Sequence, residues 1–163
     1  MKNFILGIIL HFMFVGILSG QVPDKIPTFS KFISMETGEQ FTSDSLDLNN
    51  IQVFVLIDPG CGHCQELGQG IAKSLDQIRE DVDFYFISMQ EKSLVDGYIN
   101  MFAKELKTDS RVKFLYDPEA EFYLNFNPKN FPSTYIFEAE TLQLIKQFDG
   151  DNNAEMIVSL LKK

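Results

Sequence analysis

The only two cysteines of the chain are separated by two residues, in the tetrapeptide Cys61-Gly62-His63-Cys64. The tetrapeptide follows an apolar run at 51–57 and the turn at 58–60, and it precedes a segment with helical periodicity. Two cysteines at this spacing on the first turn of a helix can close a small disulfide ring. The unpaired N–H groups at the helix start favour a thiolate, which is the species that attacks a disulfide. The pattern therefore predicts thiol–disulfide exchange.

The place of each residue in this motif suggests its role. Cys61 is at the more exposed helix start, so we expect it to be the nucleophile, and Cys64, one turn further in, should be the resolving thiol that attacks a mixed disulfide. His63 can stabilise the Cys61 thiolate by its charge when protonated or by a hydrogen bond, unless it is an exposed residue without a role. Asp58 and Glu66 are the nearest carboxylates, and each is either a proton carrier for Cys64 or a solvated charge.

The scarcity of cysteine and histidine limits the other kinds of site. Beyond residue 20 the chain has one histidine, so a Ser-His-Asp or Cys-His-Asn site would have to use His63. A structural zinc site needs four ligands, and only three candidates exist. An inert disulfide in so small a ring would gain little loop-closure entropy. Binding of a soft ion such as Cu(I) by Cys61 and Cys64, with or without His63, remains the alternative to redox chemistry.

The first 20 residues have the pattern of a secretory signal peptide. A lysine at position 2 precedes an apolar run at 4–18, and Ser19-Gly20 offers small residues for cleavage. The run is short for a spanning helix, although retention as an N-terminal membrane anchor remains the alternative. Loss of this segment removes one lysine and changes the formal net charge from −9 to −10. So acidic a chain is a poor binder of polyanions, which argues against nucleic acid as a partner.

The remaining 21–163 segment has the length of one domain, and its hydrophobic periodicity predicts an alternation of strands and helices. The unit of strand, helix and strand around the cysteines should be parallel and right-handed, and a later hairpin should add antiparallel strands. A mixed sheet with helices on both faces follows, with the site at the carboxyl ends of its strands. The expected strands are 29–34, 39–41, 51–57, 82–88, 112–116, 133–138 and 142–148, and the expected helices are 64–79, 94–106, 119–125 and 154–161.

Two features of the predicted helices matter for packing: two glycines in the first helix and an apolar face on the second. Gly68 and Gly70 each weaken the first helix by roughly 1 kcal/mol relative to alanine, so a kink or close packing is expected there. In the second helix Leu94, Tyr98 and Met101 are expected on or near one apolar face, together with Phe102 and Leu106.

Over about residues 29–163 the sequence resembles thioredoxin-fold proteins, most of all the TlpA-like branch of exported thiol–disulfide oxidoreductases. The resemblance rests on the hairpin segment 35–42, on the C-x-x-C, on the lead segment 115–123 and on Asn130-Phe-Pro-Ser-Thr134, which is similar to the cis-proline loop. It implies an α/β fold of three layers, α/β/α, with a mixed central sheet, an N-terminal hairpin and a helical insertion at 94–106 before the cis-Pro loop.

The resemblance also implies roles for residues outside the cysteine pair. Pro132 should follow a cis peptide bond beside the Cys61 sulfur, where a residue without an N–H cannot perturb the thiolate. Phe131 and Gly60 are the expected substrate contacts, although the family usually has Trp at the position of Gly60 and Thr or Val at that of Phe131. Val55 stands roughly where thioredoxin has a buried acid.

The function implied is that of an exported oxidoreductase, periplasmic or secreted, or membrane-anchored facing the periplasm if the N-terminal segment is retained. Its partners would be protein substrates that contain cysteine and a redox partner that recharges the pair, and no cofactor beyond the Cys61–Cys64 disulfide is expected. Phe126, Phe131 and Tyr135 either form an apolar collar for polypeptide substrates or belong to the core.

Overall fold

The computed structural model describes residues 21–163, so the predicted signal peptide at 1–20 lies outside the described residues. Seven strands form one mixed sheet in the order β2-β1-β5-β4-β3-β6-β7. β4 pairs in parallel with both β3 and β5, and all other neighbours are antiparallel. The strands are β1 (Phe32–Ser34), β2 (Gln40–Phe41), β3 (Ile51–Leu56), β4 (Val82–Ser88), β5 (Val112–Tyr116), β6 (Ser133–Phe137) and β7 (Leu144–Asp149).

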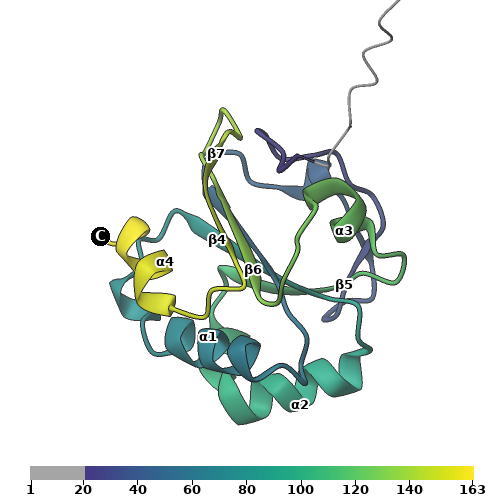
Figure 1. The fold of residues 1–163 in the computed structure, drawn as a ribbon, viewed down its shortest axis with the longest axis vertical. Helices are drawn as coiled ribbons and strands as arrows, with labels where there is room; N and C mark the ends of the chain where they lie inside the picture. The colour runs from purple at the N-terminus through teal and green to yellow at the C-terminus, as the bar shows by residue number, and fades with distance from the viewer. Residues whose placement is uncertain (1–20) are drawn as a thin grey trace, which may run out of the picture.

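Four α-helices cover the two faces of this sheet, as the sequence predicts. They are α1 (Gly62–Ala72), α2 (Lys92–Phe102), α3 (Glu121–Phe126) and α4 (Ala154–Leu160). In Figure 1, α1, α2 and α4 lie together on one side of the sheet, and α3 lies on the other side. The fold is thus the expected three-layer α/β/α arrangement. Within residues 21–163 no helix has both the length and the apolarity needed to cross a bilayer.

Alternation along β3 explains why the sheet is covered on both faces. All six of its residues are buried. Val53 and Val55 belong to the core beneath α1, α2 and α4, while Phe54 and Leu56 belong to the aromatic core beneath α3. Successive strand residues point to opposite faces, so a strand of continuous apolar character needs a packed layer on each side.

The first predicted helix is shorter than expected. α1 ends at Ala72, and a 3₁₀ turn, Leu75–Gln77, follows it. The apolar positions Leu75 and Ile78 continue the helical spacing, but they belong to the turn and to the segment after it. The side chain of Ile78 is buried in the core, and its backbone forms an isolated bridge with Lys162 near the C-terminus. The apolar residue at position 78 therefore reflects packing near the C-terminus and not a further turn of α1.

The predicted apolar face of α2 is wrong in part. The helix ends at Phe102, and Leu106 lies in a separate 3₁₀ turn, Lys104–Thr108. The residues that α2 buries are Val95, Tyr98 and Ile99. Leu94 and Met101 are instead 51% and 70% exposed. The sequence of α2 contains two overlapping apolar stripes, and the sheet takes the one that carries the β-branched residues.

Candidate functional site

Cys61 and Cys64 lie at the start of α1, just beyond the carboxyl end of β3. Cys61 is the N-cap residue, with extended backbone angles, and its side chain is half-buried. Cys64 is fully buried one turn further in, and both cysteines are free thiols. A sulfur at the N-cap lies beside the unpaired N–H groups of the helix, which stabilise a thiolate there. The exposed end of the pair is therefore the one suited to attack.

The loop that leads into Cys61 is held by hydrogen bonds of its own. The Asp58 carboxylate accepts from the Gly60 N–H over 2.7 Å, and the Asp58 carbonyl accepts from the Cys61 N–H over 3.0 Å. Gln65, from the first turn of α1, donates to the Pro59 carbonyl over 2.9 Å. These contacts fix the path of the chain from β3 into the helix.

Cys64 lies in a setting that keeps its proton on. Burial raises the pKa of the Cys64 thiol to about 12. The Asp58 N–H donates to the sulfur over 3.4 Å and opposes the rise, while a hydrogen bond with the Cys61 side chain and the negative charges of Cys61 and Asp58 add to it. Asp58 is thus the carboxylate whose charge acts on this thiol. Val55, which stands roughly where thioredoxin has a buried acid, is a fully buried residue of the core.

Glu66 and His63 occupy the outer side of the same helix turn. His63 is exposed on the first turn of α1. The Glu66 carboxylate is also exposed and accepts a hydrogen bond from the Asn152 side-chain amide, just before α4. Glu66 is therefore engaged with the N-terminal end of α4, on the surface of the molecule.

Tyr98 links α2 to the helix of the cysteines, and sequence reasoning did not single it out for the site. Its hydroxyl donates to the Cys64 carbonyl over 3.1 Å. A Cβ at Gly68 would lie 1.9 Å from that hydroxyl oxygen, so only glycine leaves room for it. Gly70 is likewise required by close packing, since a Cβ there would lie 2.5 Å from the Cβ of Ala154 on α4. The expectation of close packing at these two glycines is confirmed.

The loop before β6 reaches the same end of the sheet. Ser133 pairs with Leu56, the last residue of β3, so Pro132 lies beside the point where the chain leaves for Cys61. The Phe131–Pro132 peptide bond is cis, and Pro132 is buried. The Gly150 N–H donates to the Pro132 carbonyl over 2.8 Å.

One carboxylate secures the backbone ahead of this proline. Asp149, the last residue of β7, accepts hydrogen bonds from the N–H groups of Lys129 and Asn130 over 3.2 and 3.1 Å. A residue at the end of one strand thereby sets the approach of the chain to the next. Asp149 was missed from the sequence because nothing local marks a contact 20 residues away.

Phe131 is the only member of the proposed aromatic collar that reaches the surface. It is half-buried, and its ring lies 6.1 Å from the ring of Tyr123 in an edge-on arrangement. Phe126 and Tyr135 are completely buried and pack with each other at 5.5 Å. For these two residues the core interpretation is correct, and the collar is reduced to Phe131. Gly60, the other expected substrate contact, is exposed directly before Cys61.

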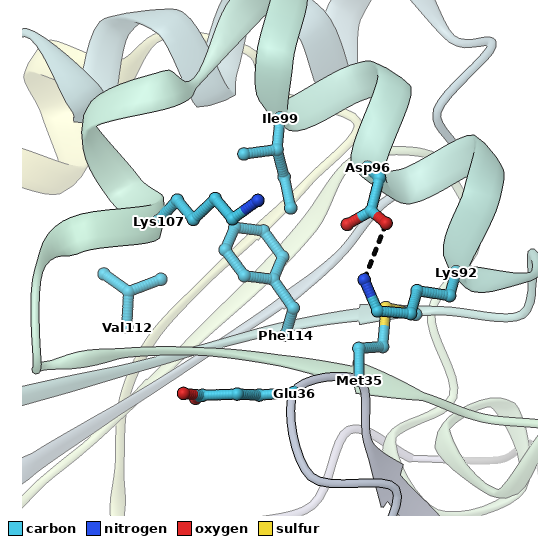
Figure 2. Close-up of a pocket in the computed structure, with 8 residues that line it drawn as sticks. All are labelled: Met35, Glu36, Lys92, Asp96, Ile99, Lys107, Val112 and Phe114. Atoms are coloured by element: carbon cyan, nitrogen blue, oxygen red, sulfur yellow. Dashed lines mark hydrogen bonds and ion pairs between the residues drawn. The ribbon is translucent and has the colours of Figure 1, made fainter.

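Some other pockets in the described part of the chain lie away from the two cysteines. One of them, between α2 and the sheet, has a volume of about 240 Å³. Figure 2 shows that Lys92 and Asp96 point toward one another in it, and their ion pair measures 2.6 Å. None of its lining residues belongs to the cysteine site. Among residues 21–163 no group of three or more His, Cys, Asp or Glu side chains is placed to hold a metal ion.

Solved structures share this architecture. The MTB protein dsbF, described in mixed oxidized and reduced forms, is 19% identical with a TM-score of 0.62, over 87% of this chain and 100% of its own. A protein of Chlorobium tepidum provisionally named thiol:disulfide interchange protein DsbE is 14% identical with a TM-score of 0.62, over 86% and 96%. A thioredoxin-like protein of Aeropyrum pernix is 9% identical with a TM-score of 0.63, over 82% and 88%.

No protein-family model and no curated protein sequence matches the chain. At identities below one fifth the structural likeness establishes the fold alone. The protein has an α/β thioredoxin-like fold, with Cys61 and Cys64 at the start of α1 and Pro132 at the start of β6.

Proposed function

We propose that the protein is an extracytoplasmic thiol–disulfide oxidoreductase that exchanges disulfides with protein substrates through Cys61 and Cys64. The observation that carries the proposal is the asymmetry of the pair: a half-buried cysteine at the N-cap of α1 and a fully buried one a turn behind it. This asymmetry suits a mechanism in which one cysteine attacks and the other resolves. The names of structural neighbours, among them a thiol:disulfide interchange protein, agree with it.

In the reducing direction the Cys61 thiolate attacks one sulfur of a substrate disulfide. A mixed disulfide forms between Cys61 and that sulfur, and the other substrate sulfur leaves as a thiolate that takes up a proton. Cys64 then loses its proton and attacks the Cys61 sulfur, which closes the Cys61–Cys64 disulfide and releases the second substrate thiol. Two electrons pass from the pair to the substrate, and the reverse sequence oxidises a substrate dithiol.

The neighbouring residues have supporting parts in this proposal. His63 stabilises the Cys61 thiolate, and the accessible edge of the Phe131–Pro132 loop presents backbone to the substrate. Gly60, directly before Cys61, and Phe131, directly before the cis-proline, contact the chain that carries the substrate disulfide in this proposal. Their position at one end of the sheet supports these parts.

The proposal is tested by single replacements of the two cysteines. Cys61→Ser should abolish turnover in an insulin-reduction assay, whereas Cys64→Ser should accumulate mixed disulfides with substrate, because attack is retained and resolution is lost. The double variant is the control for non-specific trapping. Equal trapping by both single variants would contradict the assignment of roles. Stoichiometric copper in the purified protein, with no turnover, would favour the metal-binding alternative.

Export is part of the same proposal, and it is tested on the native protein. The charged start and the apolar run before Ser19-Gly20 support it. Mass spectrometry of protein recovered from outside the cytoplasm should find a chain that begins near Gln21. An intact chain from Met1 in a soluble cytoplasmic fraction would contradict export while leaving the redox chemistry open to its own test.

A further inference from the structure

An open groove of about 390 Å³ runs from the cysteine loop along α2. Pro59 and Gly60, which directly precede Cys61, form one end of it. Leu94 and Met101 line its length, and they are the two apolar residues of α2 that turn away from the core. They are seven residues apart, which corresponds to about 10 Å along a helix, or to about three residues of extended chain. Apolar surface thus continues outward from the nucleophile.

Gly97 sits in the middle of this groove, and core packing does not explain it. A Cβ at Gly68 or Gly70 would collide with a neighbouring side chain, whereas a Cβ at Gly97 would meet nothing within 4 Å. A glycine inside a helix costs roughly 1 kcal/mol relative to alanine. Gly97 therefore destabilises α2, and no packing contact in the core requires it. What the missing side chain does provide is depth between Leu94 and Met101.

The chemistry of the lining points to one kind of occupant. The one charged residue among the lining residues is Asp58, and the polar ones are Gln90 and Ser93, with Tyr98, whose hydroxyl already donates to the Cys64 carbonyl. A segment with apolar side chains and a positive charge complements such a surface. The unbranched methionine side chain adapts to varied apolar shapes, which suits substrates of differing sequence.

We propose that this groove binds about three extended residues of the substrate polypeptide next to its reacting cysteine, and that it prefers apolar residues with a lysine or arginine among them. The inference rests on the proposed function, because the peptide that enters the groove belongs to the substrate whose disulfide Cys61 attacks. It adds a specificity site on α2, on the opposite side of the cysteine loop from the proposed Phe131–Pro132 contact.

The test uses cysteine peptides joined to glutathione by a disulfide, with Leu-Lys-Leu, Leu-Glu-Leu or Ser-Lys-Ser beside the cysteine, and oxidised glutathione as the small substrate. Burial of two leucine side chains should make the Leu-Lys-Leu peptide react with the reduced protein roughly tenfold faster than Ser-Lys-Ser. The Leu-Glu-Leu peptide should be slower than Leu-Lys-Leu, and the difference should shrink at high salt.

Two variants fill or polarise the groove without touching the core. Gly97→Gln and Met101→Gln should remove most of the preference for the leucine peptides and leave the rate with oxidised glutathione unchanged. Met156→Gln is the matched control, since Met156 is also exposed on a helix, at 44%, but lies on α4. An unchanged preference in both groove variants would overturn the groove assignment alone. If the reduced protein reacts with none of the disulfides, oxidised glutathione included, both the proposed function and the groove assignment are overturned.

Discussion

Cys64 holds its proton because the fold surrounds it, and this has a measurable effect on stability. Its pKa rises from an ordinary thiol value of 9.0 to about 12 on burial. The folded protein therefore binds this proton more tightly than the unfolded chain does. The resulting stabilisation is fully present below pH 9 and is lost as the pH rises from about 9 toward 12.

We expect the reduced protein to lose free energy of unfolding as the pH rises from 8.5 to 9.8, by up to about 1.4 kcal/mol per pH unit in the upper part of this range. Urea unfolding under reducing conditions measures the loss. The Cys64→Ala variant is the control, because it lacks the group and should show a smaller dependence over the same range. A wild-type profile that runs parallel to that of Cys64→Ala would show that burial does not hold the proton.

His63 is the residue of the motif whose effect should appear in the redox equilibrium. Replacing it with proline should make the pair more reducing, because the thiolate loses an imidazole that can carry positive charge. Each shift of about 30 mV corresponds to about 1.4 kcal/mol. Equilibration against glutathione measures the change, and His63→Gln separates loss of charge from the effect of proline on the helix. If both variants keep the wild-type potential, the helix end and the Asp58 loop set it instead.

The residues of the site divide by how far their contacts reach along the chain. Cys61, Cys64 and Pro132 could be named from the sequence because a local motif marks each of them. Tyr98 could not, because its hydrogen bond to the Cys64 carbonyl joins residues 34 apart and depends on how α2 is rotated. Asp149 depends in the same way on the placement of β7.

Among the elements, the helices show where hydrophobic periodicity stops being decisive. β4 and β5 have the predicted bounds, because each is a short apolar run that ends at a polar or proline-containing turn. For α2 the pattern admitted two apolar stripes, and only packing on the sheet chooses between them. The choice left Leu94 and Met101 on the surface. The sequence thus located the helix but not the face that it buries.

The contrast between two glycines tests this packing at the level of helices. Gly68→Ala should destabilise the protein by about 1–3 kcal/mol, because the new methyl group collides with Tyr98 at the contact between α1 and α2. Gly97→Ala should instead stabilise it by roughly 1 kcal/mol, since the site is open and alanine favours the helix. Thermal unfolding of both variants gives the two signs.

A second replacement checks the cause of the expected loss at Gly68. Adding Tyr98→Phe to Gly68→Ala removes the hydroxyl that comes within 1.9 Å and should recover part of the stability. Equal effects of alanine at both glycine positions would mean that helix propensity, not the Tyr98 contact, governs them.

The whole molecule separates its reactive end from a polar network at the opposite end of the sheet. Near the start of β3 the buried Gln52 accepts a hydrogen bond from the Tyr85 hydroxyl over 2.9 Å. Gln52 also donates to the carbonyls of Asp47 and Asn50, each over 2.7 Å. The network ties the loop before β3 to β3 and β4. Stability and chemistry are thereby assigned to different ends of the same strands.

Tyr85→Phe should lower the free energy of unfolding by about 1–3 kcal/mol, because it leaves the buried Gln52 oxygen without that donor. The rate with oxidised glutathione should not change. Tyr116→Phe is the control, since the hydroxyl of this half-buried tyrosine has no hydrogen-bond partner in the described part of the chain. A loss of rate that matches the loss of stability would mean that the two ends are coupled.

The placement of Tyr98 against the helix of the cysteines gives the protein a built-in optical reporter. The chain has five tyrosines and no tryptophan, so its longest-wavelength ultraviolet emission comes from tyrosine. The ring whose hydroxyl donates to the Cys64 carbonyl lies close enough for a change from dithiol to disulfide to alter its emission. The redox state of the cysteine pair can then be followed in real time without a label. The Tyr98→Phe variant is the control, because it lacks this emitting residue beside Cys64.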